Sequence, residues 1–312
     1  MKELRAIKSV YCYYFPEIRN LIDGLTKKFP HEIFLKSIFP KLDDFHFPII
    51  EKYIRFHSQT LPGLEDFSYR YQTDGSSEGI FHFLASLKVN NPGVTVYAFK
   101  GEYEGYKNYS NNLKLNFVEI DLREDPKKLK KGVWFISNPS AINGNIIPNY
   151  VINKICEAGH EVALDCSYVG LTKPYRFDIN HPNIAAIFTS FSKPFGLFYY
   201  RIGFLFSKRK IDSLECNIWF KNLFSLLIAD KILSEIEPEY FYKKYRPIQE
   251  KIIENINKEF NLRVRPSDVL ILGYMDNHSL SQNAIEMVEN FKRGEYYRFC
   301  LTPYFLEKEV RI

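Results

Sequence analysis

The chain has 312 residues, of which 46% are hydrophobic and 25% are charged, and its formal net charge is +5. This composition is typical of a globular protein, and no run approaches the about 18 consecutive apolar residues that a membrane-spanning helix needs. Lysines and arginines are dispersed, so the charge does not predict a nucleic-acid partner. The opening residues, from Met1 to Arg5, lack the apolar core of a secretory signal, and we expect a cytoplasmic location.

The five cysteines are odd in number and widely spaced, which predicts reduced thiols rather than a disulfide framework. The seven histidines are scattered, and the sequence contains neither a Cys-x-x-Cys pair nor a His-x-x-x-His pair. We therefore expect no bound metal.

The hydrophobic pattern changes along the chain. A helix is expected near residues 17–25. From about residue 70 to 206, short apolar runs alternate with turn signals and helical patterns, which predicts an α/β fold with a mostly parallel sheet. Beyond 206, helical spacing predicts helices at 211–236 and 241–260, followed by a small α+β region. The expected strands are 94–99, 117–120, 133–137, 162–165, 184–190, 202–206, 269–272 and 297–301, with a helix at 281–291.

A lysine follows the strand predicted at 184–190, in the segment Ser190-Phe-Ser192-Lys193-Pro-Phe-Gly196, and Arg201 comes eight residues later. A lysine that forms an imine must lose its proton part of the time, and burial beside another cation lowers its pKa. Read alone, the segment also fits a surface lysine and arginine beside an ordinary strand.

The pattern Ser-x-Ser-Lys-x-x-Gly followed by Arg-x-Gly resembles the cofactor-lysine signature of class I and II aminotransferases, in the aspartate aminotransferase superfamily of fold type I. The resemblance implies that Lys193 holds pyridoxal 5'-phosphate as a Schiff base. It also implies that Ser190, Ser192 and Arg201 bind the cofactor phosphate.

An aspartate ends the strand predicted at 162–165, and Tyr168 follows it by three residues. Ligands of parallel sheets bind beyond the carboxyl ends of the strands. A carboxylate facing the pyridine nitrogen keeps the nitrogen protonated, so that the ring can accept electrons. The family's Asp-x-x-Tyr pattern implies this role for Asp165 and a hydrogen bond from Tyr168 to the cofactor's phenolic oxygen. The alternative for Asp165 is an ordinary turn residue.

Upstream, a glycine-flexed turn opens a helical pattern in the segment Gly75-Ser76-Ser77-Glu78. The start of a helix presents free N–H groups and the positive end of a dipole to an anion. The segment resembles the family's phosphate cup, which implies phosphate contacts for Gly75, Ser76 and Ser77. A plain helix cap is the alternative.

Two further segments resemble the family in part. The segment after residue 99 resembles the one whose aromatic ring stacks on the pyridine, which implies that role for Tyr103, with Tyr106 as the second choice. The family's asparagine loop is matched incompletely by residues 137–148. Aligned on Gly144, the position that usually bonds the phenolic oxygen is Ala141, and we expect Asn138 to have taken over unless that bond is missing.

Arg298 lies in an otherwise apolar strand pattern, where an arginine is unfavourable unless an anion meets it. It resembles the family's clamp for the substrate carboxylate, since a guanidinium can form two parallel hydrogen bonds to a carboxylate. A strand-edge arginine that reaches solvent is the alternative.

Together the motifs predict a pyridoxal-phosphate-dependent aminotransferase that acts on amino acids and 2-oxo acids through the Lys193 Schiff base and a quinonoid or carbanion intermediate. A lyase, cyclase or decarboxylase on the same scaffold is the alternative, and a non-catalytic binding protein is a further one. The resemblance implies a homodimer with shared active sites. It also implies a large domain at 46–212 with a seven-stranded type of sheet covered by helices on both faces, and a small domain from 1–45 and 213–312.

Overall fold

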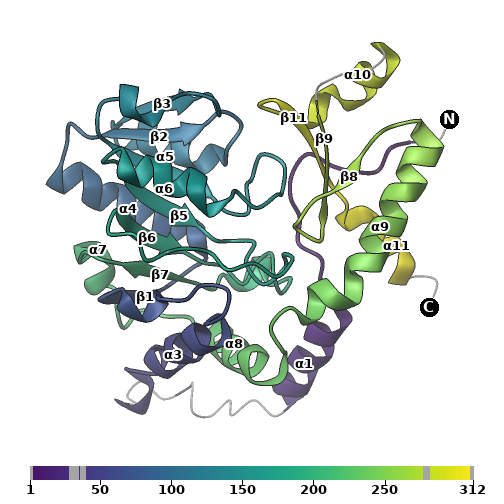
Figure 1. Cartoon of the computed structure of the whole chain (residues 1–312). Helices are drawn as coiled ribbons and strands as arrows, with labels where there is room; N and C mark the ends of the chain where they lie inside the picture. Colours follow the sequence, from purple (N-terminus) through teal and green to yellow (C-terminus); the bar gives the residue numbers. More distant parts are fainter. Residues whose placement is uncertain (1–2, 28–34, 36–39, 277–281, 310–312) are drawn as a thin grey trace.

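A seven-stranded sheet forms the centre of the larger part of the molecule (Figure 1). The computed structural model describes residues 3–27, 35, 40–276 and 282–309. The strand order is β1-β7-β6-β5-β4-β2-β3, and β7 runs antiparallel to both of its neighbours while the other pairs are parallel. The strands are β1 (Tyr69–Thr73), β2 (Thr95–Phe99), β3 (Asn116–Ile120), β4 (Val133–Ser137), β5 (Glu161–Asp165), β6 (Ile184–Phe188) and β7 (Gly203–Ser207).

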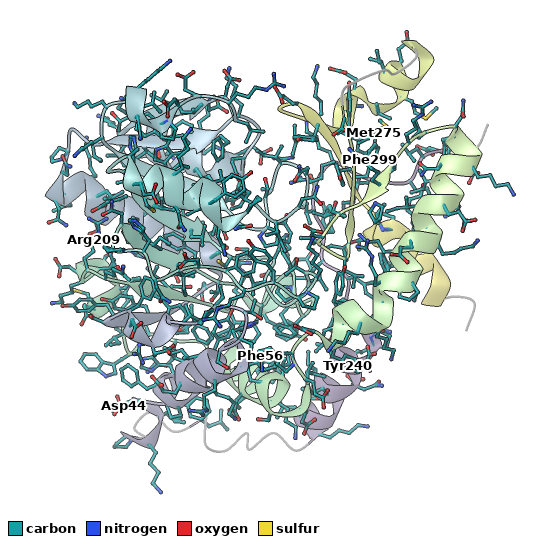
Figure 2. The ribbon with its side chains drawn as sticks, in the orientation of Figure 1. Asp44, Phe56, Arg209, Tyr240, Met275 and Phe299 are labelled. Carbon is teal, nitrogen blue, oxygen red and sulfur yellow. The ribbon has the colours of Figure 1, made fainter. Side chains whose placement is uncertain are left out.

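Helices cover both faces of this sheet, and side chains fill the space between the layers (Figure 2). Neighbouring residues of β4 show the alternation, since Phe135 packs with one group of helices and Trp134 with the other. Because both faces are covered, β2, β4, β6 and β7 are buried along their whole length. One face carries α4 (Ser76–Asn90), α5 (Glu104–Asn112) and α7 (Asp212–Glu215), and the other carries α3 (His46–Phe56), α6 (Asn149–Glu157) and α8 (Leu223–Glu235).

A second, antiparallel sheet of order β10-β11-β9-β8 lies beside the long helix α9 (Figure 1). The N-terminal segment runs along it, because Ile7 pairs with Cys300. The helix α1 contacts α9, where Glu17 accepts a hydrogen bond of 2.9 Å from Tyr245. The remaining elements are α1 (Pro16–Lys27), α9 (Tyr240–Phe260), β8 (Arg265–Pro266), β9 (Leu272–Asp276), α10 (Gln282–Val288), β10 (Lys292–Arg293), β11 (Tyr296–Cys300) and α11 (Thr302–Glu309), with 3-10 turns at Pro40–Leu42, Leu64–Asp66, Pro126–Lys128, Phe198–Tyr200 and Glu289–Phe291.

The predicted fold class is confirmed, and the predicted strands of the large sheet lie within two residues of those observed. Two predictions were wrong. The helix expected at 211–236 is broken between α7 and α8, where Asn222 caps α8 by accepting a hydrogen bond from the Ser225 N–H. The strand expected at 269–272 begins only at Leu272, because the apolar residues before it are buried in a turn that hydrogen-bonds to Leu171.

Other expectations concern chemistry rather than folding. All five cysteines are free thiols, as predicted. In the described part of the chain, no helix combines the length and the apolar character needed to cross a membrane. Strand β1 was not predicted, since its residues are only partly buried and give a weak hydrophobic signal. The domain boundaries at 46 and 212 stay a prediction.

Candidate active site

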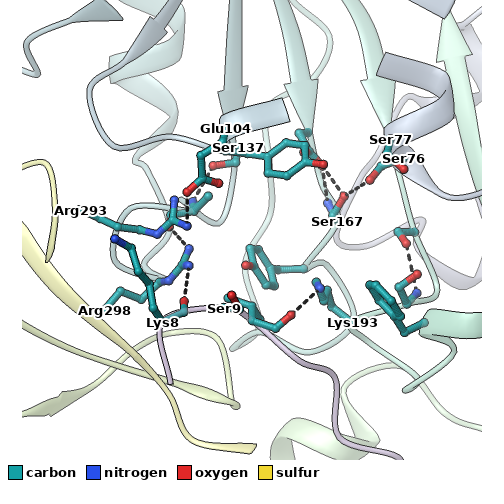
Figure 3. A pocket seen from close by; sticks show the side chains of 18 of the residues that line it. Lys8, Ser9, Ser76, Ser77, Glu104, Ser137, Ser167, Lys193, Arg293 and Arg298 are labelled. Atoms are coloured by element: carbon teal, nitrogen blue, oxygen red, sulfur yellow. Dashed lines mark hydrogen bonds and ion pairs between the residues drawn. The ribbon is translucent and has the colours of Figure 1, made fainter. Parts of the chain in front are cut away.

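A pocket of about 610 Å³ lies at the carboxyl ends of the large sheet, where the small sheet and the N-terminal segment face it (Figure 3). Ser76, Ser77 and Lys193 lie toward one end, and Arg293 and Arg298 toward the other. Ten of the twelve residues singled out in the sequence line this pocket. They are Ser76, Ser77, Tyr103, Asp165, Tyr168, Ser190, Ser192, Lys193, Arg201 and Arg298.

Lys193 enters the pocket from the loop that follows β6. This loop is held on β7 by backbone hydrogen bonds, including the one from the Thr189 N–H to the Phe204 carbonyl. The Lys193 Nζ donates to the carbonyl of Val10 at 2.9 Å and lies 5.2 Å from the centre of the Phe198 ring. Burial lowers the pKa of this amine, and the positive charges of two pocket arginines lower it further, against opposing effects of nearby thiols. Lys193 can therefore lose its proton more readily than an exposed lysine.

Asp165 ends β5 and is buried, with both carboxylate oxygens hydrogen-bonded. One oxygen accepts from the Tyr106 hydroxyl at 2.8 Å, and the other from the Ser167 hydroxyl and from the Ser167 N–H at 3.0 Å. Burial raises the pKa of Asp165, although these hydrogen bonds and the charge of Lys193 oppose the shift. A buried carboxyl of this kind is stabilised by a positively charged donor placed against it.

Arg201 and the start of α4 form an anion cup. The Arg201 Nη2 donates to the Asp74 carbonyl at 2.6 Å and to the Ser77 hydroxyl at 3.1 Å, and Nη1 lies 3.5 Å from the Ser192 Oγ. Gly75 has φ +82°, and a Cβ there would lie 2.6 Å from the Arg201 Nη2. Gly75 therefore serves the cup by leaving room for the guanidinium, although it does not itself line the pocket.

Ser167 connects this cup with the buried acid. Its hydroxyl lies 2.8 Å from the Ser76 Oγ and also contacts Asp165. Ser167 was not predicted from the sequence, although its place between Asp165 and Tyr168 could have suggested it. Tyr168 is buried and lines the pocket, and burial raises the pKa of its hydroxyl while Arg298 and Arg293 lower it.

Two aromatic residues follow β2 with different surroundings. Tyr103 lines the pocket just before α5, and a Cβ at Gly105 would lie 2.2 Å from its ring, so a glycine is required there. Tyr106, the second choice for a stacking ring, is fully buried and donates to Asp165. Tyr106 therefore holds the Asp165 carboxylate in place through this hydrogen bond.

The prediction for Asn138 needs correction. Its side-chain nitrogen donates to the Ile147 carbonyl at 2.9 Å, and its side-chain oxygen accepts from the Ile147 N–H at 2.8 Å. Both polar side-chain atoms of Asn138 therefore bind the backbone of its own loop. Ala141, rather than Asn138, lines the pocket. We withdraw the predicted contact between Asn138 and the cofactor.

Two arginines of the small sheet reach the far end of the pocket. Arg298, on β11, is only 3% exposed, and it donates to the carbonyls of Ala141 and, at 3.0 Å, Lys8. Burial lowers its pKa. Arg293, which was not predicted from the sequence, donates to Glu104 at 2.6 Å. Among the described residues, the Nε of neither arginine has a hydrogen-bond partner, so both retain a free donor.

No family model matches the chain. It is 28% identical over 242 residues to histidinol-phosphate aminotransferase from Methanococcus maripaludis strain C5, which covers 70% of this chain and 63% of the relative. It is 27% identical over 210 residues to histidinol-phosphate aminotransferase from Thermococcus kodakarensis, covering 60% of this chain and 61% of the relative. The chain thus spans less than two thirds of the length of these relatives.

Solved structures share the fold over nearly the whole chain. An aminotransferase from Staphylococcus aureus has a TM-score of 0.71 at 16% identity and covers 99% of this chain and 93% of that protein. Histidinol-phosphate aminotransferase from Sinorhizobium meliloti in complex with pyridoxal-5'-phosphate has a TM-score of 0.68 at 16% identity, covering 98% and 90%. L-threonine-O-3-phosphate decarboxylase from Porphyromonas gingivalis has a TM-score of 0.67 at 15% identity, covering 97% and 99%.

The mostly parallel sheet with its pocket at the strand ends is the fold type I architecture. The sequence relatives named above are aminotransferases, and solved structures of this fold include aminotransferases, so the chain is similar to members of the family that its motifs resemble.

Proposed function

We propose that the chain is a pyridoxal-phosphate-dependent aminotransferase that acts on amino acids and 2-oxo acids. One observation carries the proposal: a buried amine, a buried acid and an anion cup line the same pocket. The groups are Lys193, Asp165, and the cup formed by Arg201 with Ser76 and Ser77. The aminotransferase names of the sequence relatives support the same reading.

The pocket fits the cofactor on observations of this chain. The cup combines a helix start, a guanidinium and hydroxyls, the donor set that suits a phosphate. Gly75 leaves room for Arg201, since a Cβ at this position would lie 2.6 Å from the Arg201 Nη2. Asp165 keeps a buried carboxyl that a protonated ring nitrogen would stabilise, and Tyr103 offers a planar face beside it.

In this proposal Ser76, Ser77, Ser190, Ser192 and Arg201 hold the phosphate, with Gly75 leaving the room. Tyr103 would cover the ring, Asp165 would keep its nitrogen protonated, Tyr168 would donate to its phenolic oxygen, and Lys193 would be the amine that joins its aldehyde carbon. Bound pyridoxal phosphate supplies an electron sink for the substrate carbanion.

The residues of this chain then handle protons and position the substrate. Lys193, whose pKa burial lowers, would be the base that moves the proton of the substrate's α-carbon once the substrate's amino group has taken its place on the cofactor. Arg298, which lines this end of the pocket, would hold the substrate carboxylate. Arg293 also lies at this end, where its charge is already paired with that of Glu104.

The remaining predictions about this enzyme stay proposals. A homodimer is supported by strongly exposed aromatics at Tyr199, Trp219 and Phe220, of which Tyr199 directly follows the pocket residue Phe198. An exposed aromatic surface of this kind is typical of contacts between subunits. The location in the cytoplasm is also a prediction.

An absorbance spectrum tests the proposal. The purified protein with added pyridoxal phosphate should show the visible band of an imine, and Lys193→Ala should abolish it. Lys208→Ala is the matched control, because Lys208 donates to backbone carbonyls away from the pocket. An amino acid alone should then convert the aldehyde form to the amine form. Return of the aldehyde form with release of fragments or carbon dioxide indicates a lyase or decarboxylase, and absence of an imine band indicates a non-catalytic protein.

A further inference from the structure

A buried carboxyl group stands behind the pocket wall and has no role in the proposed mechanism. Glu102 is 6% exposed and lies between β2 and α5. One of its oxygens accepts from the Ser137 hydroxyl at 2.5 Å, and the other accepts from the Ser137 N–H at 3.4 Å. The Tyr103 N–H also lies 3.3 Å from the carboxylate. The ionised form of a buried acid is unfavourable unless hydrogen bonds replace the water that it has lost.

Ser137 connects Glu102 to the pocket. It ends β4 directly opposite Asp165 in the strand register and lines the pocket. Its hydroxyl oxygen also accepts from the Ala141 N–H at 2.6 Å. Ser137 is therefore tied to Glu102 on one side and, on the other, to the loop residue where the family's asparagine is missing.

A serine hydroxyl has only one proton to donate. When Glu102 is ionised, that proton points to the carboxylate. When Glu102 is protonated, the carboxyl can donate to the Ser137 oxygen, and the serine proton is free to point into the pocket. The protonation of Glu102 thus decides whether the wall beside Asp165 offers a donor.

Charged and titratable neighbours set this balance. Burial raises the pKa of Glu102 to about 7, and the negative charge of Asp165 adds to the shift, whereas hydrogen bonds from Ser137 and Tyr103 oppose it. On the α5 side lies the Tyr106 hydroxyl, whose pKa the charge of Glu102 helps to raise. From the small sheet, the Arg293 Nη1 lies 3.3 Å from the Glu102 carbonyl oxygen. Both forms of Glu102 are therefore populated near neutral pH.

We propose that Glu102 and Ser137 form a positioning pair that stands in for the absent asparagine at Ala141, with Ser137 donating a hydrogen bond to the phenolic oxygen of the cofactor. The inference rests on the proposed function. In this chain, the pKa of the imine would depend on Ser137, whose hydroxyl proton becomes free to face the pocket when Glu102 is protonated.

The test is a pH titration of the imine band in the protein loaded with pyridoxal phosphate. A donor at the phenolic oxygen stabilises the form in which the imine has lost its proton. Ser137→Ala should therefore raise the pKa of the imine by about one pH unit, the size of one hydrogen bond to a charged group. Glu102→Gln should lower it, because the substitution removes a negative charge and supplies an N–H that can donate to the Ser137 oxygen, as the protonated acid does. Opposite shifts are not expected of two merely structural residues.

Rescue and control variants sharpen the result. In the Ser137→Ala protein, adding Ala141→Asn should return the imine pKa toward the wild-type value. Ser140→Ala removes another buried hydroxyl of the same loop, one that accepts from the Ile142 N–H, and should leave the titration unchanged. The dissociation constant of the cofactor gives a second readout for every variant.

Each outcome either supports or overturns the inference or the proposed function. An imine pKa in Ser137→Ala equal to that of Ser140→Ala overturns the inference while leaving the proposed function intact. Absence of an imine band in the wild-type protein overturns the proposed function instead. If Ser137→Ala does not fold, Glu102→Gln decides alone, since an unchanged imine pKa refutes the pair and a lowered one supports it.

Discussion

The buried carboxyl of Glu102 makes the stability of the cofactor-free protein depend on pH. Its side chain is buried, and its partners are the Ser137 hydroxyl and two backbone N–H groups. Glu102→Gln keeps the shape of the side chain but removes its ionisation. The substitution therefore isolates the effect of this one acid on folding, independently of any ligand.

The size and sign follow from the pKa of Glu102, which rises from an ordinary 4.5 to about 7 in the folded chain. At about 1.4 kcal/mol per pH unit, the shift corresponds to about 3 kcal/mol. Because the folded pKa is the higher one, the folded state binds the proton more tightly. This stabilisation is complete below pH 4.5 and is lost as the pH rises through about 7.

Urea unfolding at about pH 5 and about pH 8 measures the effect, since most of the change falls in that interval. The free energy of unfolding of the wild type, relative to Glu102→Gln, should be greater at the lower pH by roughly 2 to 3 kcal/mol. Glu119→Gln is the control, because its exposed pair with Lys107 contributes little to stability.

A flat difference across this pH interval would refute the reasoning. It would mean that Glu102 is ionised at both pH values in the folded protein, and that hydrogen bonds from Ser137 outweigh burial and the charge of Asp165. Ser137 would then never be released to face the pocket.

Two further substitutions test the ends of the pocket. Gly75→Ala places a Cβ 2.6 Å from the Arg201 Nη2 at φ +82°, and we expect a loss of about 1 to 3 kcal/mol in unfolding free energy together with weaker cofactor binding, measured by urea unfolding and by absorbance titration. Arg298→Met removes the buried donor at the far end, and the KM for the amino acid should rise about 10- to 100-fold while the imine band persists. Loss of the imine band in Arg298→Met, as expected for Lys193→Ala, would contradict the assignment of Arg298 to the substrate end.

The local motifs could be found in the sequence because strand ends and helix starts are encoded locally. Asp165 follows a continuous apolar run, and its strand ends where the run ends. Gly75 is followed by a helical stripe, so the turn that opens α4 is visible in the pattern. In a parallel sheet these ends meet at one edge, so the topology alone brings Asp165, Lys193 and the cup toward each other.

The missed contacts depend on the packing of distant segments. Arg293 reaches Glu104 across 189 positions of sequence, and Arg298 meets Lys8 across 290. The hydrophobic periodicity of a sequence does not encode contacts between residues so far apart in the chain. The misplaced strand at 269–272 has a related cause. Val269 to Ile271 are apolar and buried in a turn that hydrogen-bonds to Leu171, and an apolar run looks the same in sequence whether or not its residues pair in a sheet.

The incomplete asparagine loop shows why one departure from a family pattern affects several residues. Ala141 is held from two sides, since its N–H donates to Ser137 and its carbonyl accepts from Arg298. The same residue therefore connects the wall beside Asp165 to the arginine at the substrate end. Because Glu102 holds Ser137, a change in its protonation alters a hydrogen bond that also positions this loop. In this arrangement, tuning of the cofactor and binding of the substrate are coupled through one peptide segment rather than adjusted separately.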